Sequence, residues 1–580
     1  MSLVTLTINN REISVEAGTT VLDAAKELNI KIPTLCYLNL HDQKTTNKPG
    51  SCRVCVVEVQ GRKNLAPACS TMVAPGMVVK TGTPKVLKAR KNIIELLLSD
   101  HPQECLTCGK SMHCELQSLA HDYGVTDIAY QGSKSDSMME LANPSIVRDT
   151  SKCILCRRCV AMCNEVQCVG AIGPVNRGFD TNISTKFNVD LKDSTCVFCG
   201  QCVNVCPTGA LMEKDNTEDV LNALDDPDKY VIVSTAPAVR SALGEEFGIM
   251  DQSVTGKMAA SLRTLGFDKV YDTDFGADLT IMEEANEFVT RFTKGENLPM
   301  ITSCCPGWVN FIEKEYGELL NHPSTCKSPQ QMWGAIAKSY LAEKLEIPVE
   351  KLYVVSVMPC IAKKYEAQRD EFVNDHGTPD IDVVISTREL AKLIQKAGID
   401  FAGLPEEDFD SMMGESTGAG VIFGTSGGVM EAALRTAYEV ITKEELPDVN
   451  FEVARGIQGV KEATVNIAGN DVSICIVNGL ANAKYLLDHM DETAKKYQFI
   501  EVMACPGGCI NGGGQPYSNG DLCMVQKRSN VLYGEDAAKP VRKSHENKEI
   551  QALYKEYLGE PNSEKAHHLL HTHYNNRTTK

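Results

Sequence analysis

Cysteine spacing is the most informative chemical feature of this 580-residue sequence. The run C-x2-C-x2-C-x3-C occurs twice, and Pro207 follows the second copy. Three thiolates at this spacing wrap a [4Fe–4S] cube, and the fourth cysteine of each run binds the other cube. A single C-x2-C would also suit zinc, but two complete copies favour iron. We predict one cube on Cys153, Cys156, Cys159 and Cys206, and a second on Cys196, Cys199, Cys202 and Cys163.

One histidine and three cysteines precede these runs, in the stretch "DHPQECLTCGKSMHCEL". Taken alone, such a set would suit a structural zinc ion. Next to two cubes, we expect a further [4Fe–4S] cluster. His113 is an alternative to His101 as the nitrogen ligand. The predicted ligands are His101, Cys105, Cys108 and Cys114.

The first 82 residues predict a small β-grasp domain. Two strands flank a turn at Asn9-Asn10, and a helix follows with Thr19 or Thr20 as its N-cap. The stretch "VCVVEVQG" reads as another strand. Four cysteines with a central C-x2-C resemble a plant-type [2Fe–2S] ferredoxin, although the first gap is longer than usual. The sequence does not predict the path of the long loop of residues 37–51. It does predict the cluster ligands, which are Cys36, Cys52, Cys55 and Cys69.

Composition limits the classes of protein that remain. A formal net charge of −18 argues against a nucleic-acid partner. No apolar run approaches the roughly 20 residues that span a membrane, and the first residues alternate like a strand rather than a signal peptide. We therefore expect a cytoplasmic protein of three to five domains, whose 24 cysteines stay reduced. Of these cysteines, 16 lie between residues 36 and 206.

The second half has a different pattern, from about residue 228. Short apolar strands such as "KYVIVSTAPAVR" and "VEKLYVVSVMPC" alternate with helices, which predicts an α/β domain with a largely parallel sheet. Ligand sites in such domains lie at the carboxyl ends of the strands. Four cysteines follow strand-like runs and could hold a fifth cluster there: Cys305, Cys360, Cys505 and Cys509.

Three stretches of this half closely resemble the signature sequences of [FeFe]-hydrogenases. They are "TSCCPGW" (302–308), "MPCIAKKYEA" (358–367) and "EVMACPGGCINGGGQP" (501–516). The order of cluster sites resembles the long clostridial type over nearly the whole chain. The implied fold is multidomain α+β and α/β. We expect a [2Fe–2S] ferredoxin-like domain (1–82), a one-His/three-Cys domain (83–126), a two-cube ferredoxin domain (143–214), a catalytic domain (228–520) and a small-subunit-like helical segment (521–580).

The resemblance implies an H-cluster, a [4Fe–4S] cube joined to a diiron unit that bears CO, cyanide and an azadithiolate. The accessory cofactors would be three [4Fe–4S] clusters and one [2Fe–2S] cluster. Cys305, Cys360, Cys505 and Cys509 would hold the cube, with Cys509 also bridging to the diiron unit. Cys304 would then be a proton carrier, because an unperturbed thiol stays protonated at neutral pH.

Other site residues are implied by the same resemblance. Glu284 and Glu287 lie at i, i+3 on one face of a predicted helix, and with Ser324 and Arg291 they match the family's proton relay. Lys363 would pair with a cyanide, and Met358, Met503 and Pro237 would line the diiron pocket. Ala238 stands where relatives often carry serine, so one hydroxyl contact is lost. The glycines at 512–514 suggest close backbone approach to the cluster rather than nucleotide binding.

The implied reaction is that of a ferredoxin hydrogenase, the reversible reduction of protons to H2 with electrons from ferredoxin or from flavin-bearing, NAD(P)-linked partner subunits. The rival interpretations are a subunit of an electron-bifurcating complex, a hydrogen sensor, a non-catalytic iron–sulfur assembly relative and a respiratory iron–sulfur subunit. Cys168 is expected to pack in the interior, and the histidines at 567, 568, 571 and 573 to form a solvated tail. Cys326, Cys475 and Cys523 have no predicted role.

Overall fold

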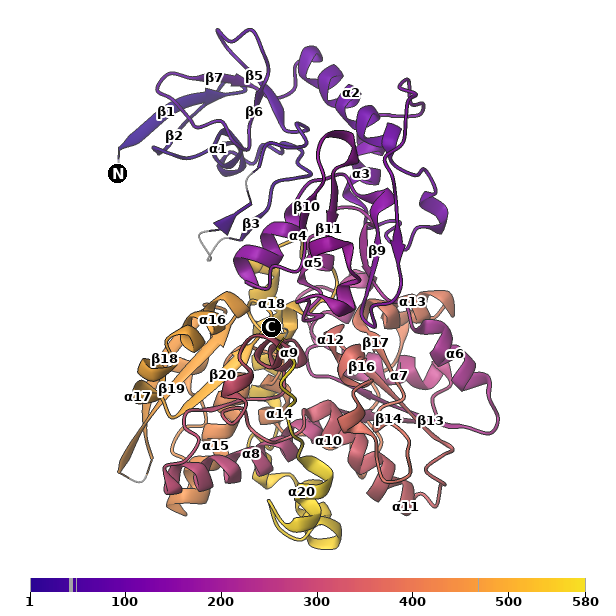
Figure 1. Cartoon of the computed structure of the whole chain (residues 1–580), viewed down its shortest axis with the longest axis vertical. Coiled ribbons are helices and arrows are strands. Elements are labelled where there is room, and N and C mark those ends of the chain that lie inside the picture. The colour runs from indigo at the N-terminus through magenta and orange to yellow at the C-terminus, as the bar shows by residue number, and fades with distance from the viewer. Residues whose placement is uncertain (1, 41–44, 48, 468, 579–580) are drawn as a thin grey trace. The chain divides into compact units, whose positions relative to one another are not determined.

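The computed structural model describes residues 2–40, 45–47, 49–467 and 469–578. Within them the chain forms two compact units, coloured by residue number in Figure 1. The first contains Met1–Glu165, Gly170–Ser194 and Cys202–Met212, and the second contains Val166–Val169, Thr195–Gln201 and Glu213–Lys580. No helix in the described ranges is both long enough and apolar enough to cross a membrane.

The first unit opens with a five-stranded sheet of order β2-β1-β7-β5-β6. A turn with positive φ at Asn9 and Asn10 joins β1 to β2, as predicted. Helix α1 (Val21–Glu27) begins after Thr20, whose hydroxyl accepts a hydrogen bond from the Asp23 N–H at 3.1 Å. Thr20 is therefore the N-cap. The strands are β1 (Leu3–Ile8), β2 (Arg11–Glu16), β5 (Val56–Val59), β6 (Ala66–Pro67) and β7 (Val78–Lys80).

The predicted loop of residues 37–51 contains one short antiparallel pair, β3 (Asn39–Leu40) with β4 (Thr45–Thr46). Residues 41–44 and 48 of this loop lie outside the described part of the chain. The rest of the unit consists of short elements and connecting loops. They are α2 (Pro84–Asp100), α3 (Glu115–Asp122), β8 (Met139–Glu140), β9 (Ile146–Asp149), α4 (Arg158–Ala161), β10 (Gly173–Val175), β11 (Asn182–Ser184), α5 (Gln201–Asn204) and β12 (Leu211–Glu213), of which α5 and β12 cross the boundary between the units.

The second unit contains two four-stranded sheets rather than one. The first has order β14-β13-β16-β17 and is parallel throughout. The second has order β15-β20-β19-β18, with only β18 antiparallel to its neighbour. The strands are β13 (Tyr230–Thr235), β14 (Lys269–Asp272), β15 (Met300–Ile301), β16 (Leu352–Met358), β17 (Val383–Ser386), β18 (Val460–Ile467), β19 (Asn470–Asn478) and β20 (Phe499–Met503).

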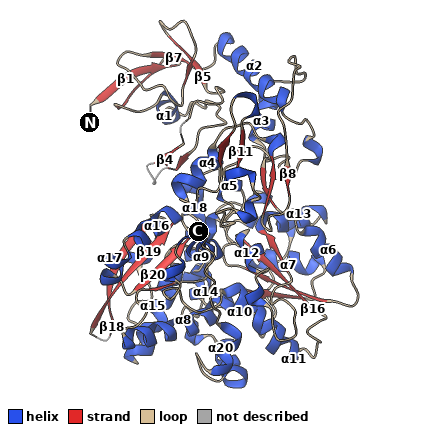
Figure 2. Cartoon of the chain, viewed as in Figure 1, coloured by secondary structure: helices blue, strands red, loops and turns tan. Residues whose placement is uncertain are grey.

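Helices pack along both sheets of this unit (Figure 2). They are α6 (Thr217–Asp225), α7 (Thr255–Leu265), α8 (Asp274–Lys294), α9 (Pro306–Glu315), α10 (Pro329–Ile336), α11 (Ala342–Lys344), α12 (Ala362–Glu366), α13 (Thr387–Lys396), α14 (Gly418–Ile422), α15 (Gly428–Thr442), α16 (Leu480–Asp488), α17 (Met490–Lys496) and α18 (Leu522–Ala538). The end of the chain adds α19 (Lys548–Leu553) and α20 (Glu564–Leu570), whose residues Ile550, Leu553 and Leu570 join the core of the first sheet.

Arg388, at the start of α13, fixes the glycine-rich loop of residues 512–516. Its guanidinium donates to Gly513 O at 2.7 Å and to Gln515 O, and it pairs with Glu213 at 2.7 Å. Both charged side chains are only 4% exposed. Removing one member of such a pair leaves the other buried without its counter-ion. The loop that follows Cys509 therefore depends on this ion pair.

We expect Arg388→Met to destabilise the second unit by about 3–5 kcal/mol, because Glu213 would lose its counter-ion. Lys396→Met is the matched control, since its pair with Glu218 is exposed to solvent and contributes little. Thermal unfolding followed by near-UV circular dichroism measures both variants. Equal midpoints for the two would show that the buried pair does not stabilise the fold.

Candidate active site

Four cysteines from distant parts of the second unit meet at the carboxyl ends of strands from both sheets. Cys305 follows β15 and precedes α9, Cys360 follows β16, and Cys505 and Cys509 follow β20. The Cys505 thiol interacts electrostatically with the other three, and Cys509 with Cys305 and Cys360. Burial, and then this mutual repulsion, raise the pKa of Cys360 to about 12 and the pKa of Cys505 well above its ordinary value.

The donor set of these four residues fits an iron–sulfur cube. Four buried thiolates repel one another strongly unless a cation neutralises them, and thiolate sulfur is the ligand that iron–sulfur clusters use. The Ala504 N–H also points at the Cys305 sulfur, 3.4 Å away. At Gly508 the backbone has φ +102°, and an added Cβ would lie 2.6 Å from Ser426 N. The chain therefore packs tightly around the place where the four sulfurs meet.

Cys304 lies next to this group and also interacts with Cys509 and with Glu284. Burial is the main cause that raises the pKa of its thiol well above the ordinary value, and the charges of Glu284 and Cys305 add to it. The thiol is therefore protonated at neutral pH. The Lys363 ammonium donates to the backbone oxygen of Cys304 at 3.2 Å.

A chain of polar side chains leads away from Cys304. Glu284 and Glu287 lie on α8, as the sequence predicted, and Ser324 Oγ donates to Glu287 Oε2 at 2.9 Å. Arg291 pairs with Glu287 at 2.6 Å. Burial, followed by the charge of Glu287, raises the pKa of Glu284 to about 8. Its buried oxygen Oε1 has no hydrogen-bond partner among the described residues. The structure thus brings all five predicted relay residues together.

The other predicted pocket residues are also buried. Met358 and Met503 end β16 and β20 and are each 2% exposed. Lys363 is buried and donates to Glu366 at 2.8 Å, in addition to its contact with Cys304 O. Pro237 is buried in the loop after β13, and the backbone oxygen of the adjacent Ala238 accepts a hydrogen bond from Gln515.

The glycines at 512–514 approach the chain segments that carry the cysteines. A Cβ on Gly513 would lie 2.7 Å from the backbone oxygen of Cys199, and a Cβ on Gly514 would lie 3.2 Å from Pro359 O. Cys199 also interacts electrostatically with Cys505. These glycines therefore allow the segment of Cys199 to pack against the loops of the four-sulfur group.

The cysteines predicted for the [2Fe–2S] site converge in the first unit. All four are buried, and the sulfurs of Cys55 and Cys69 are 3.3 Å apart. Hydrogen bonds join the Cys36 sulfur to Cys52 and Cys69. The long stretch of sequence between Cys36 and Cys52 therefore still allows the four sulfurs to meet.

The ligands predicted for the first cube also meet in this unit. Three of them belong to the first cysteine run, and the fourth, Cys206, belongs to the second run. Cys153, Cys156, Cys159 and Cys206 line a cavity of about 30 Å³. The two runs share a local backbone: φ is positive at Leu155 and Phe198, and both N–H groups donate to a cysteine sulfur at 3.4 Å. For the second cube, Cys163 and Cys202 belong to the first unit and Cys196 and Cys199 to the second, so its ligand set stays a prediction.

At the one-His/three-Cys site, Cys114 interacts with Cys105 and Cys108. Burial is the main cause that lowers the pKa of His101 to about 4, and its Nδ1 is buried without a hydrogen-bond partner in the described ranges. A neutral imidazole with an unused nitrogen fits a metal ligand. The choice between His101 and His113 stays a prediction.

Two expectations for single residues were wrong. Cys168 is exposed rather than packed, because it lies on an irregular loop between the helical turn ending at Val166 and β10. His571 is 7% exposed and is not part of a solvated tail, because Leu570 beside it is in the core.

Sequence reasoning also missed three neighbours of Glu287. Cys326 Sγ is 3.7 Å from Glu287 Oε2, and Thr325 Oγ1 lies 3.2 Å from the same oxygen and 2.7 Å from His571 Nδ1. Cys326 and Thr325 directly follow Ser324 in the sequence, which was a usable signal. His571 gave none, because 246 residues separate it from Thr325.

Comparison with known proteins gives matches along the whole chain. Five family descriptions match: "2Fe-2S iron-sulfur cluster binding domain" (2–84), "NADH-ubiquinone oxidoreductase-G iron-sulfur binding region" (90–129), "4Fe-4S dicluster domain" (152–210), "Iron only hydrogenase large subunit, C-terminal domain" (229–513) and "Iron hydrogenase small subunit" (523–577).

Similar proteins extend over the same range. NADP-reducing hydrogenase subunit HndD of Solidesulfovibrio fructosivorans is 57% identical and covers 99% of both chains. Iron hydrogenase 1 of Clostridium pasteurianum is 41% identical over 98% of this chain and 99% of its own. A solved structure of the apo [FeFe]-hydrogenase HydA1 from Chlamydomonas reinhardtii, in a variant form, matches 63% of this chain and all of its own, with 43% identity and a TM-score of 0.56. With relatives this similar over its full length, the chain belongs to the [FeFe]-hydrogenase family.

Proposed function

We propose that this chain catalyses the reversible reaction 2H⁺ + 2e⁻ ⇌ H2. The observation that carries the proposal is the meeting of Cys305, Cys360, Cys505 and Cys509 beside a protonated fifth thiol, Cys304. These four would hold an H-cluster through their sulfurs. When bound, the H-cluster supplies the metal at which protons and electrons combine.

In this proposal the protein moves protons through Cys304. Its raised pKa keeps a proton on sulfur, and its neighbour Glu284 also holds one below about pH 8, the pKa to which burial raises that carboxyl. A group with a pKa near the working pH both accepts and releases protons readily. Ser324 and the Glu287–Arg291 pair would continue the relay toward the surface of the second unit.

Electrons would reach the same place through the accessory clusters. Cys199, a predicted ligand of the second cube, interacts with Cys505 of the four-sulfur group. The reduction potential of the proton/H2 couple, with one electron per proton, falls by about 59 mV for each tenfold decrease in proton concentration. Seven pH units therefore place it at roughly −410 mV at pH 7. Plant-type ferredoxin clusters lie around −400 mV. Because the two couples are nearly equal, we infer that the reaction runs in either direction.

Three residues support an enzyme over an assembly relative or a sensor. Cys304, Lys363 and Met503 are buried or partly buried around the four sulfurs, where they could contact the diiron unit. An assembly factor without that unit would need none of them. We therefore favour an enzyme.

We further propose that the electron partner is NAD(P)-linked rather than ferredoxin alone. The support is the relative at 57% identity, which is named as a subunit of an NADP-reducing hydrogenase. A flavin-bearing partner chain would exchange electrons with the accessory clusters. The 24 free cysteines suit the reducing cytoplasm, which we propose as the location.

Matured protein should evolve H2 and show infrared bands of bound CO and cyanide. Cys304→Ala should lower the rate at least about 100-fold, because the relay loses its first carrier, and should leave the bands in place. Cys523→Ala, at an exposed cysteine on α18, is the matched control and should keep its full rate. Absence of the bands from matured wild type would overturn the proposed function, and a fully active Cys304→Ala would remove Cys304 from the relay.

Glu284→Gln should also slow H2 evolution at least about 100-fold, because an amide cannot carry the proton. The unfolding midpoint provides a second measurement. The pKa of Glu284 rises from 4.5 to about 8 on folding, so its contribution to stability is full below pH 4.5 and decreases as the pH rises to about 8. Wild type should lose stability relative to Glu284→Gln across this range, and parallel stability curves would refute the raised pKa.

Native purification tests the electron partner. We expect this chain to co-elute with flavin-containing chains and to reduce NADP⁺ or NAD⁺ with H2. The ferredoxin alternative predicts a chain that elutes alone and reduces ferredoxin but neither nicotinamide.

A further inference from the structure

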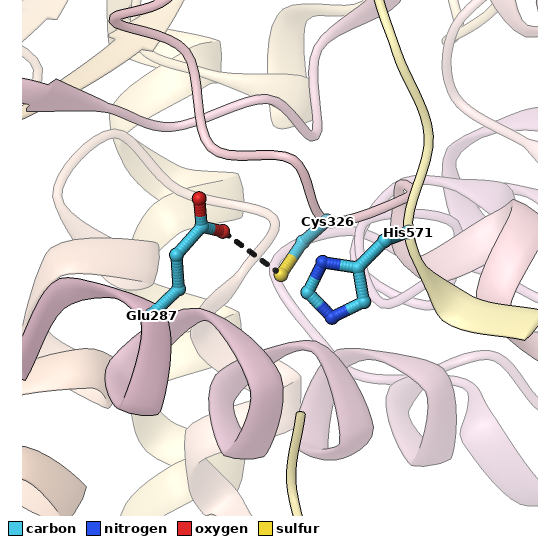
Figure 3. A group of neighbouring side chains, drawn as sticks. All are labelled: Glu287, Cys326 and His571. Atoms are coloured by element: carbon cyan, nitrogen blue, oxygen red, sulfur yellow. Dashed lines mark hydrogen bonds between the residues drawn. The ribbon is translucent and has the colours of Figure 1, made fainter. Parts of the chain in front are cut away.

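A buried group of three metal-binding side chains adjoins the proton relay. Glu287 lies on α8, Cys326 on the loop before α10, and His571 just after α20 (Figure 3). One ligand atom of each residue lies within 4.8 Å of the others. Carboxylate oxygen, thiolate sulfur and imidazole nitrogen together are ligands typical of zinc. We propose that these three residues bind Zn²⁺ or a similar thiophilic divalent cation, which inhibits proton transfer by taking Glu287 out of the relay.

The distances suit a tetrahedral ion. The carboxylate oxygen Oε2 of Glu287 and the sulfur of Cys326 are 3.7 Å apart. With zinc–oxygen and zinc–sulfur bonds of ordinary length, a tetrahedral site would place these two atoms about 3.5 Å apart. Small side-chain movements would therefore be enough to bind the ion.

The histidine is already oriented as a ligand. Its Nε2 lies 3.0 Å from Glu283 Oε2, while Nδ1 lies on the side of Thr325 and Cys326. A neutral His571 that donates from Nε2 keeps its lone pair on Nδ1. A carboxylate behind a ligating imidazole is the usual arrangement in zinc proteins, where it fixes the ring and raises its basicity. Tyr554 in turn donates to Glu283, so the support is itself held in place.

Charge also balances at this position. Zinc binding would release the proton of Cys326, and the thiolate with the Glu287 carboxylate would then neutralise the two charges of the ion. This matters because Cys326 is 1% exposed, and a buried site disfavours net charge. The second carboxylate–histidine group of the described chain, Glu439 with His545 and Glu546, lacks sulfur and already pairs with Lys543 at 2.8 and 2.9 Å.

A polar cavity adjoins the site at His571. It has a volume of about 710 Å³, and its lining includes His571, His568, His376 and Asp375. His568 is exposed, where its Nε2 lies 3.0 Å from Asp375. The lining also contains lysines, of which Lys327 and Lys338 are paired with Asp380 and Asp382. A hydrated cation could thus approach His571 along the imidazole and carboxylate groups of the cavity.

The inhibitory part of this inference rests on the proposed function, because it assumes that Glu287 transfers protons. Removal of the Glu287 carboxylate from Ser324 and Arg291 would interrupt the relay beyond Glu284. The binding part does not depend on activity. Zinc retention and rate are therefore measured separately.

The experiment adds zinc sulfate to matured, iron-replete protein under anaerobic conditions. Elemental analysis after desalting counts the retained zinc, X-ray absorption at the zinc edge identifies its ligands, and H2 evolution gives the rate. Wild type should retain one zinc ion per chain on sulfur, nitrogen and oxygen ligands, and should lose activity over the same range of zinc concentration. Cys326→Ser and His571→Ala should weaken both effects at least about tenfold, and Glu283→Gln about 10–100-fold.

His568→Ala is the matched control, because it removes an exposed imidazole from the same cavity without touching the three ligands. It should bind zinc and respond to it as wild type does, and each variant is compared with its own zinc-free rate. Equal zinc retention by wild type and Cys326→Ser would overturn the site, and this serine variant remains informative if His571→Ala does not fold. Zinc retained at the site without loss of rate would overturn the inhibition. If no variant evolved H2, the zinc measurements would still decide the site.

Discussion

Repulsion between buried sulfurs is the constraint on which the catalytic half of this protein depends. Four thiols meet in one place; burial raises the pKa of each, and the charges of neighbouring cysteines raise the pKa of Cys360, Cys505 and Cys509 further. Only a cation relieves that repulsion when they ionise, so the fold is organised to be completed by iron. Cys304 lies in the same place but serves, in our proposal, as the thiol that stays protonated.

Two sheets, the first parallel and the second mixed, supply the four cysteines. The carboxyl ends of β15 and β20 come from one sheet and that of β16 from the other, so the ligands approach from different directions. The glycine-rich loop after Cys509 then closes around the strand ends, fixed by Arg388. The absence of side chains at Gly513 and Gly514 lets backbone segments pack where side chains would clash.

Much of this arrangement could be predicted from the sequence, because local spacing determines it. The repeated cysteine runs were visible in the sequence, and they share a local backbone with positive φ at Leu155 and Phe198; Thr20 is one of the two N-caps that the sequence predicted. The position of Glu284 on a helix followed from periodicity, but its raised pKa depends on burial that only the folded chain shows. The division into two sheets was not predicted, since strand pairing over long separations leaves no local pattern.

The contacts of the C-terminal segment were the least predictable part. His571 reaches Thr325 and Glu283 only because α20 packs into the core through Leu570, and nothing in a run of polar residues indicates such a partner. The segment therefore contributes side chains to the surroundings of Glu287 as well as covering the core. If Glu287 transfers protons as we propose, this position lets the C-terminal segment influence that transfer.

Anomalous diffraction at the iron edge from crystals of matured protein tests the central claim most directly. We predict iron within bonding distance of the sulfurs of Cys305, Cys360, Cys505 and Cys509, and none bonded to Cys304. Iron bonded to Cys304, or no iron among the four sulfurs of an active preparation, would contradict the account.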